Sequence, residues 1–206
     1  MKDKIILASA SPRRKELLAQ VGYVFDVVPS QAGEKEVPGE TPAEHVVRLS
    51  REKAREVSTR DDIDGRWILG SDTIVLRDDQ ILGKPCDDED ATRMLRSLSG
   101  RTHQVLSGYA ILDRRTGESR TAAVTTRVCF RSLTDAEIAG YIASGEPADK
   151  AGAYAIQGLG AFMVSQIEGS YSNVVGLPLC EVVQALESLG AVPPPLRPAS
   201  DGGTEP

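Results

Sequence analysis

Residues Ile5–Leu18 read IILASASPRRKELL, and this stretch indicates a strand, a turn and a helix in immediate succession. The apolar, partly β-branched run Ile5–Ala8 is typical of a short buried strand. Ser11 is a favourable N-cap, and Pro12 suits the first helical position because its missing N–H would have no partner there. The sequence therefore predicts a strand that ends in a hydroxyl-bearing turn, which leads directly into a helix.

The first turn of that helix carries two guanidinium groups, Arg13 and Arg14. A helix N-terminus has a partial positive charge, so two cations there are mildly unfavourable. An anion at the turn would remove the conflict, because backbone N–H groups, the hydroxyls of Ser9 and Ser11 and the guanidinium groups could all bind it. A polyphosphate is the natural ligand of this kind, and the alternative is a solvated basic helix face.

Composition limits the classes of function. The chain has 206 residues, of which 40% are hydrophobic and 26% charged, as expected for a soluble protein of one domain or two small lobes. A net charge of −6 and 4% aromatic residues disfavour nucleic-acid binding, so phosphate chemistry would need local basic clusters. Cys86, Cys129 and Cys180 form no C-x-x-C motif, and no signal peptide or membrane-spanning run is apparent. We therefore expect a cytoplasmic protein that has neither a disulfide framework nor a membrane association.

A second helix is predicted over Thr41–Ser58, because Thr41-Pro42-Ala43-Glu44 is a capping box with proline at the first helical position. Lys53 falls within the apolar arc of this helix rather than on its charged side. A lysine in that position either extends to the edge of the core or points into a cleft to meet an anion. Both alternatives stay open, and Lys53 is a candidate phosphate ligand.

An acidic residue interrupts the next apolar segment, in which Trp67-Ile68-Leu69 leads through Gly70-Ser71-Asp72-Thr73 into Ile74-Val75-Leu76. Burying the charge of Asp72 is unfavourable unless a metal ion or a cationic cluster pairs with it. The alternative is a turn aspartate that is bonded to nearby backbone. A hairpin around Arg77–Gln80 would return the chain through Ile81-Leu82 and hold Lys84 near Asp72.

The remaining pattern alternates helices and strands, which predicts an α/β fold without internal repeats. The segment Asp149–Gly158 is rich in small residues and suits a loop close to a ligand, although it matches neither familiar nucleotide-binding fingerprint. His103 is expected to be structural, because neither a second histidine nor a cysteine stands at metal-ligand spacing from it. Further strands are expected at 24–29, 105–113, 121–131 and 162–167, and further helices at 87–98 (ended by Gly100), 134–145 and 178–189. We expect one domain over residues 1–192 and a disordered tail over 193–206.

Several motifs occur in a fixed order along most of the chain: L-A-S-A-S-P-R-R-K-E-L-L, R-E-K-A, G-S-D-T-I-V, L-G-K-P, L-S-G-R-T-H-Q-V, D-K-A-G-A-Y-A-I-Q-G and V-V-G-L-P-L. With these motifs the chain resembles the Maf family of nucleoside triphosphate pyrophosphatases, also called septum-formation inhibitors. The resemblance implies a two-lobed α/β fold with an elongated mixed sheet and a central cleft, similar to the inosine-triphosphate pyrophosphatases. It also implies cleavage of a nucleoside triphosphate to the monophosphate and pyrophosphate with a divalent cation, Mg²⁺ or Mn²⁺.

The resemblance also carries roles to particular residues. Asp72 matches the catalytic carboxylate, and Arg13, Thr73 and Gln157 match positions that distinguish the branches of the family. This combination is similar to the branch that acts on dTTP and UTP, and modified pyrimidine nucleotides are further candidate substrates. Ala155, where close relatives often have glycine, adds only a methyl group.

From charge alone, we expect the triphosphate to be bound by a set of hydroxyl and cationic side chains, namely Ser9, Ser11, Arg14, Lys53 and Lys84. Asp72 would act on the attacking water or hold the metal ion, with Glu34 as a second candidate metal ligand. Two alternatives remain: a nucleotide-binding regulator of cell division with incidental hydrolysis, and the 7-methyl-GTP branch of the family. The sequence leaves a homodimer open.

Overall fold

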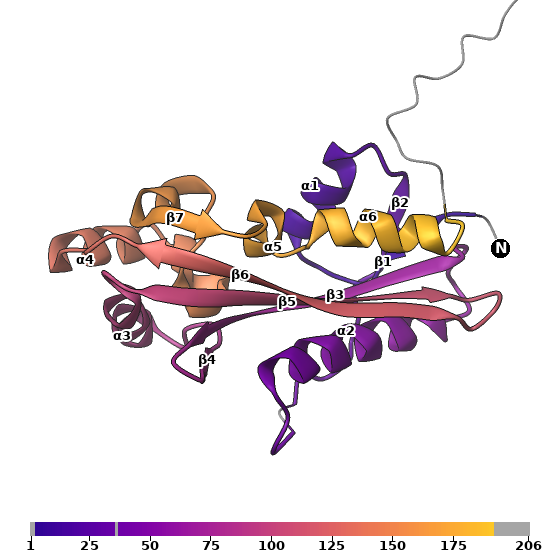
Figure 1. The fold of residues 1–206 in the computed structure, drawn as a ribbon, viewed down its shortest axis with the longest axis horizontal. Helices are drawn as coiled ribbons and strands as arrows, with labels where there is room; N and C mark the ends of the chain where they lie inside the picture. The colour runs from indigo at the N-terminus through magenta and orange to yellow at the C-terminus, as the bar shows by residue number, and fades with distance from the viewer. Residues whose placement is uncertain (1–2, 36, 192–206) are drawn as a thin grey trace, which may run out of the picture.

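The computed structural model describes residues 3–35 and 37–191, and the predicted tail 193–206 lies outside this part. Three long strands form the centre of a mixed sheet (Figure 1). The strands are β1 Ile5–Leu7, β2 Phe25–Val27, β3 Trp67–Arg77, β4 Gln80–Leu82, β5 Thr102–Asp113, β6 Ser119–Phe130 and β7 Val164–Glu168. The helices are α1 Pro12–Gln20, α2 Pro42–Ser58, α3 Asp88–Leu98, α4 Asp135–Ala143, α5 Tyr171–Val175 and α6 Leu179–Ser188. Three short 3-10 helices are η1 Glu146–Asp149, η2 Ala151–Ala153 and η3 Gly158–Met163.

The strand order is β2-β1-β3-β5-β6-β7, and β4 also pairs with β3. β1 is parallel to β2 and β3, whereas β3, β5, β6 and β7 pair in antiparallel order. This arrangement confirms the predicted α/β class with a mixed sheet. Antiparallel neighbours suit the sequence here, because 12-residue strands joined by short turns can pair along their whole length.

Helices cover both faces of the sheet. Figure 1 shows α2 along one face, and α1, α5 and α6 on the opposite side of the long strands. Alternation along β3 explains the two cores, since Trp67 and Leu69 pack with residues of α1 and α6, whereas Ile68 packs with residues of α2. A third cluster lies where α3 and α4 pack on the other end of the sheet, and includes Leu95 and Ile138.

Helix α2 lies unusually close to the sheet, because two glycines leave room for its backbone. A Cβ at Gly70 would lie 2.1 Å from the carbonyl oxygen of Ser50, and one at Gly108 would lie 2.3 Å from that of Val46. No side chain fits at such distances, so these strand positions require glycine. The close contact fixes which residues of α2 face β3.

Several predicted boundaries differ from the structure. His103 lies inside β5 instead of before it, and Phe162 belongs to η3 because β7 begins at Val164. Asp149–Gly158 contains short 3-10 turns instead of a plain loop. Helix α5 was not predicted, since its five residues are too short for a helical period to appear in the sequence. Within the described residues, no helix has both the length and the apolar character needed to cross a membrane.

Candidate active site

A gap in the pairing of β3 opens the sheet to solvent. On one edge of β3, β1 pairs with Trp67–Leu69 and β4 pairs with Val75–Arg77. Within the described residues, the segment Gly70–Ile74 therefore has no strand partner on that edge. A cleft of about 360 Å³ lies beside this gap. Because side chains alternate along a strand, residues from both faces of the sheet reach the same opening.

Every residue that the sequence singled out for the site lines this cleft. They come from six separate segments of the chain: Ser9, Ser11, Arg13, Arg14, Glu34, Lys53, Asp72, Thr73, Lys84 and Gln157. The structure thus brings the set together, while the role of each residue stays a prediction. The predicted hairpin is present, since β3 and β4 turn through Asp78 and Asp79, both with positive φ, and Lys84 follows β4. Tight two-residue turns of this kind match the twist of paired strands.

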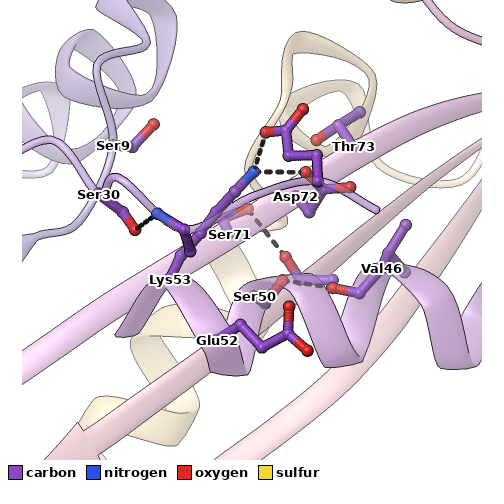
Figure 2. A network of polar contacts seen from close by, with 12 residues as sticks. Ser9, Ser30, Val46, Ser50, Glu52, Lys53, Ser71, Asp72 and Thr73 are labelled. Carbon is purple, nitrogen blue, oxygen red and sulfur yellow. Dashed lines mark hydrogen bonds and ion pairs between the residues drawn. The ribbon is translucent and has the colours of Figure 1, made fainter. Parts of the chain in front are cut away.

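Asp72 and Glu34 share one lysine. The Nζ atom of Lys53 donates to Asp72 Oδ1 at 2.6 Å (Figure 2). The same atom donates to Glu34 Oε1, also at 2.6 Å. Asp72 lies in the middle of a continuous strand, so the alternative of a turn aspartate bonded to nearby backbone is wrong. The hydrogen bond and charge of Lys53 hold the pKa of Glu34 below its usual value, although burial opposes this shift.

The packing of α2 on β3 brings Lys53 to Asp72. Gly70 and Asp72 are two residues apart on β3 and so share the face that carries α2. Ser50 and Lys53 are three residues apart on α2 and share the helix surface that faces β3. Because Gly70 admits the backbone of α2 at Ser50, the ammonium group of Lys53 arrives at Asp72. Lys53 therefore points into the cleft instead of extending to the edge of the core.

Arg14 approaches from the opposite face of the sheet. Its Nε donates to the carbonyl oxygen of Gly176 at 2.8 Å, Nη1 to Ser9 Oγ at 3.1 Å and Nη2 to Thr73 Oγ1 at 3.1 Å. These three acceptors are neutral, and burial lowers the pKa of Arg14 despite the opposing charge of Asp72. Arg14 is half-buried, and a cation whose hydrogen-bond partners are all neutral is stabilised where an anion lies close by.

The hydroxyls of this region already have partners. Thr73 Oγ1 lies 3.1 Å from Arg14 Nη2, 2.8 Å from Ser107 Oγ and 3.2 Å from the carbonyl oxygen of Gly176. A hydroxyl has one proton and two acceptor sites, so Thr73 would exchange one of these partners to bind a ligand. Ser9 Oγ accepts from Arg14 and from the Ser11 backbone N–H, and its own proton can still be donated.

Two further charged residues line the cleft, and neither was proposed from the sequence. Asp149 Oδ2 lies 3.9 Å from Arg13 Nη1, and Asp149 also pairs with the ammonium group of Lys150. The only signal in the sequence is their position in the D-K-A-G-A-Y motif, where charge stands directly before the small residues. Asp149 therefore links helix α1 to the segment that carries Gln157.

The cleft is positive in a protein of net charge −6. Five cationic side chains line it against three carboxylates: Arg13, Arg14, Lys53, Lys84 and Lys150 against Glu34, Asp72 and Asp149. Its low-dielectric walls concentrate this positive potential. The arrangement suits a ligand with several negative charges, such as a polyphosphate.

The donor set also fits a divalent cation that is shared with such a ligand. Within the described residues, no group of three or more His, Cys, Asp or Glu could hold a metal ion by itself. Glu34 and Asp72 both bond to Lys53 Nζ, so their carboxylates border the same ammonium group. Mg²⁺ is commonly held by one or two carboxylates together with phosphate oxygens and water, and these two residues fit that pattern.

Fold and site together define an α/β protein with a cation-lined cleft beside a single strand carboxylate. Comparison with known proteins agrees, since the sequence model of the Maf family, described as Maf-like protein, matches residues 4–189. The chain is 68% identical over 188 residues to a dTTP/UTP pyrophosphatase of Syntrophotalea carbinolica, covering 91% of this chain and 86% of the relative. It is 55% identical over 191 residues to a dTTP/UTP pyrophosphatase of Geobacter sulfurreducens, covering 93% and 99%. The chain therefore belongs to the Maf family.

Proposed function

We propose that this protein is a nucleotide pyrophosphatase that hydrolyses dTTP and UTP to the monophosphate and pyrophosphate. The observation that carries the proposal is the meeting of Asp72 with five cationic side chains in one cleft. The names of the relatives at 55% and 68% identity support the choice of substrates. Arg13, Thr73 and Gln157 line the same cleft, as a role in substrate choice would require.

Binding of the triphosphate rests on charge. The triphosphate carries roughly four negative charges, and its oxygens would bind Arg13, Arg14 and Lys84 in place of water. The hydroxyls of Ser9 and Ser11 would donate to phosphate oxygens. Ser11 caps helix α1, so the free N–H groups of the first turn also face an anion at this place. Reactions at phosphorus are catalysed mainly by positioning and by neutralising charge, which this set of residues supplies.

Asp72 is proposed to act on the attacking water. Lys53 occupies Oδ1, whereas Oδ2 has no hydrogen-bond partner among the described residues and can accept a proton. Water attacks the α-phosphorus and its proton passes to Oδ2. The bond from the α-phosphorus to the bridging oxygen then breaks, and the electron pair leaves with pyrophosphate, where the lysines and arginines stabilise it.

A divalent cation, Mg²⁺ or Mn²⁺, is proposed as a cofactor held by Asp72 and Glu34 together with the triphosphate. When bound, it would supply further neutralisation of phosphate charge. Lys53 keeps the two carboxylates together before any substrate arrives, since it bonds to both at 2.6 Å. Titration of activity with Mg²⁺ and Mn²⁺, in wild type and in Glu34→Gln, tests this assignment.

Base recognition is proposed for Gln157, with Thr73 beside Arg14. The amide group of Gln157 can donate and accept together, as the alternating carbonyl and N–H groups of uracil and thymine require. Release of pyrophosphate across a panel of normal and modified nucleotides tests the substrate assignment. We expect dTTP and UTP or their modified forms to be hydrolysed fastest. Turnover of 7-methyl-GTP with none of dTTP or UTP would contradict the proposal.

A further inference from the structure

Gln157 lies in a bend of the segment 155–160, called the turn below, and two residues outside the cleft bond to both ends of it. Tyr141 is buried in α4, and Glu146 begins η1. The Tyr141 hydroxyl accepts a hydrogen bond from the backbone N–H of Ala155 at 3.1 Å. Glu146 accepts from the backbone N–H groups of Leu159 at 3.0 Å and Gly160 at 3.0 Å. The segment 155–160 is thus bonded on either side of Gln157.

The two holding residues are themselves joined. The hydroxyl of Tyr141 donates to Glu146 Oε1 at 2.9 Å, so a single connected network reaches both ends of the turn. Burial raises the pKa of Tyr141, which keeps its proton at neutral pH. Burial alone would raise the pKa of Glu146, but the N–H groups of Gly160 and Leu159 bring it below its usual value. The donor and the acceptor therefore both keep their roles at neutral pH.

Two glycines allow the turn to close on this pair. Gly158 has a φ of +67°, and a Cβ there would lie 2.7 Å from Glu146 Oε2. A Cβ at Gly160 would lie 2.3 Å from the carbonyl oxygen of Ala155 and 2.8 Å from the Tyr141 hydroxyl. The two glycines thus let the backbone come close to Tyr141 and Glu146, which fixes the Gln157 backbone at the wall of the cleft.

We propose that Tyr141 and Glu146 are positioning residues for substrate specificity, which act by fixing the backbone of Gln157 against the base. The inference rests on the proposed role of Gln157 in reading uracil or thymine. Uracil presents an N–H at N3 where cytosine presents an acceptor. A firmly placed amide discriminates between the two bases, whereas a mobile one can adapt to either.

The test uses Tyr141→Phe and Glu146→Gln in the full-length protein. The first change removes only the hydroxyl. The second keeps the size of the side chain but places an NH₂ group where an N–H donor must be accepted. We expect the ratio of kcat/KM for UTP to that for CTP to fall about tenfold, mainly through KM for UTP, while kcat changes less than twofold. The inhibition constant of inorganic triphosphate, which has no base, should stay within twofold.

Two matched variants serve as controls. Glu137→Gln changes a carboxylate of α4 that likewise accepts a backbone N–H, that of Thr134 at 2.8 Å, and that has no hydrogen bond to a described residue of 155–160. Tyr171→Phe changes an exposed tyrosine. Both should leave the ratio of UTP to CTP unchanged. In a double-mutant cycle, Gln157→Ala should make the Glu146→Gln effect on this ratio disappear, since both changes remove the same discrimination.

Three outcomes would overturn the inference. The first is an unchanged ratio of UTP to CTP in both variants, and the second is additive effects in the double-mutant cycle. The third is a loss in the binding of inorganic triphosphate as large as the loss in kcat/KM for UTP, which would show that the whole cleft is disturbed. If the wild type hydrolyses neither UTP nor dTTP, the proposed function itself fails, and this result is distinct from all three.

Discussion

Two buried ion pairs lie along strand β3, one at its start and one in its middle, and they differ in how fully the carboxylate is bonded. Just before its first residue, Arg66 donates to Asp113 at the end of β5, with Nε to Oδ1 at 3.0 Å and Nη2 to Oδ2 at 2.7 Å. Asp113 also accepts the backbone N–H of Arg115 at 2.8 Å. Five residues further along β3 from Trp67, Asp72 meets Lys53 through Oδ1 alone, at 2.6 Å. Both carboxylates are buried, with 2% of Asp113 and 7% of Asp72 exposed.

The difference lies in how fully each carboxylate is bonded. Both oxygens of Asp113 are bonded to the Arg66 guanidinium, and the pair closes a turn at the end of the sheet. Asp72 bonds to Lys53 through Oδ1 alone, Oδ2 has no hydrogen-bond partner among the described residues, and the residue lines the cleft. Burial and ion pairing alone therefore do not identify a reactive carboxylate. The catalytic role proposed for Asp72 is supported instead by its unbonded Oδ2 and its place at the cleft.

The largest expected effect is on catalysis at Asp72. Asp72→Asn keeps the size of the side chain but removes the proton acceptor, so kcat should fall by about 10³-fold. Stability should change little, because Lys53 keeps its bond to Glu34. Pyrophosphate release measures the first effect and urea unfolding the second. Asp113→Asn is the matched control and should retain the wild-type kcat; a retained kcat in Asp72→Asn would break the comparison.

The next largest effect is expected where the position of Lys53 relative to Asp72 is disturbed. Gly70→Ala would place a methyl group 2.1 Å from the Ser50 carbonyl and push α2 away from β3. We expect a loss of about 1–3 kcal/mol in the free energy of unfolding. A roughly tenfold loss in kcat/KM should accompany it, since Lys53 moves with α2.

Gly140→Ala is the control for this change, because nothing lies within 4 Å of a Cβ at that position of α4. It should leave activity unchanged and not lower stability. Wild-type kcat/KM in folded Gly70→Ala would show that the approach of α2 does not set the position of Lys53.

For the Arg66–Asp113 pair we expect the reverse: a loss of stability without a loss of kcat. Asp113→Ala leaves the Arg66 guanidinium with only the exposed Asp3, at 3.4 Å, and the Arg115 N–H without its acceptor. It should lower the free energy of unfolding by about 2 kcal/mol. The kcat of the folded fraction should not change, because Asp113 does not line the cleft. Unfolding in urea and pyrophosphate release at a temperature below the transition measure the two quantities. A large loss of kcat would place Asp113 in the same functional unit as Asp72.

The smallest effect is the pH dependence of the two regions. Hydrogen bonds from Arg66 hold the pKa of Asp113 well below its usual range. A lowered folded-state pKa adds stability above the ordinary aspartate pKa of about 3.9, and this stability is lost as the pH falls through the folded value. The stability advantage of wild type over Asp113→Asn should therefore be constant at pH 5–7 and shrink below about pH 4.

Glu34 should also contribute stability that is lost as the pH falls, but the loss should be smaller than for Asp113. Lys53 lowers its pKa, but the Glu34 side chain is 60% exposed and solvent screens the pair. Urea unfolding of Glu34→Gln over the same pH range checks this order. A larger pH-dependent loss for Glu34→Gln than for Asp113→Asn would reverse the comparison between the two regions.

Local signals in the sequence predicted most elements of the fold. Capping boxes at Thr41 and Thr134 located α2 and α4, and both boxes are present with their reciprocal hydrogen bonds. These signals are reliable because a cap satisfies backbone groups within four residues of itself. Helix α5 was not predicted because it is short and is held by bonds to distant strands: Nδ2 of its Asn173 donates to Val105 at 3.1 Å and to Thr126 at 3.0 Å. Bonds between distant segments leave no periodic pattern in a sequence.

What the sequence determined by itself is the list of candidate site residues, all of which line the cleft, and most of the local elements that carry them. Asp72 stood out as a charge inside an apolar strand and Lys53 as a charge inside an apolar helix face, and each was costly alone. Only the tertiary structure decided that the two buried charges pair with each other. Gly70 lets α2 approach β3 closely enough for Lys53 and Asp72 to bond at 2.6 Å. The tertiary structure also decided that β1 and β4 leave the edge of β3 open at Asp72, since strand pairing depends on contacts between segments far apart in the chain.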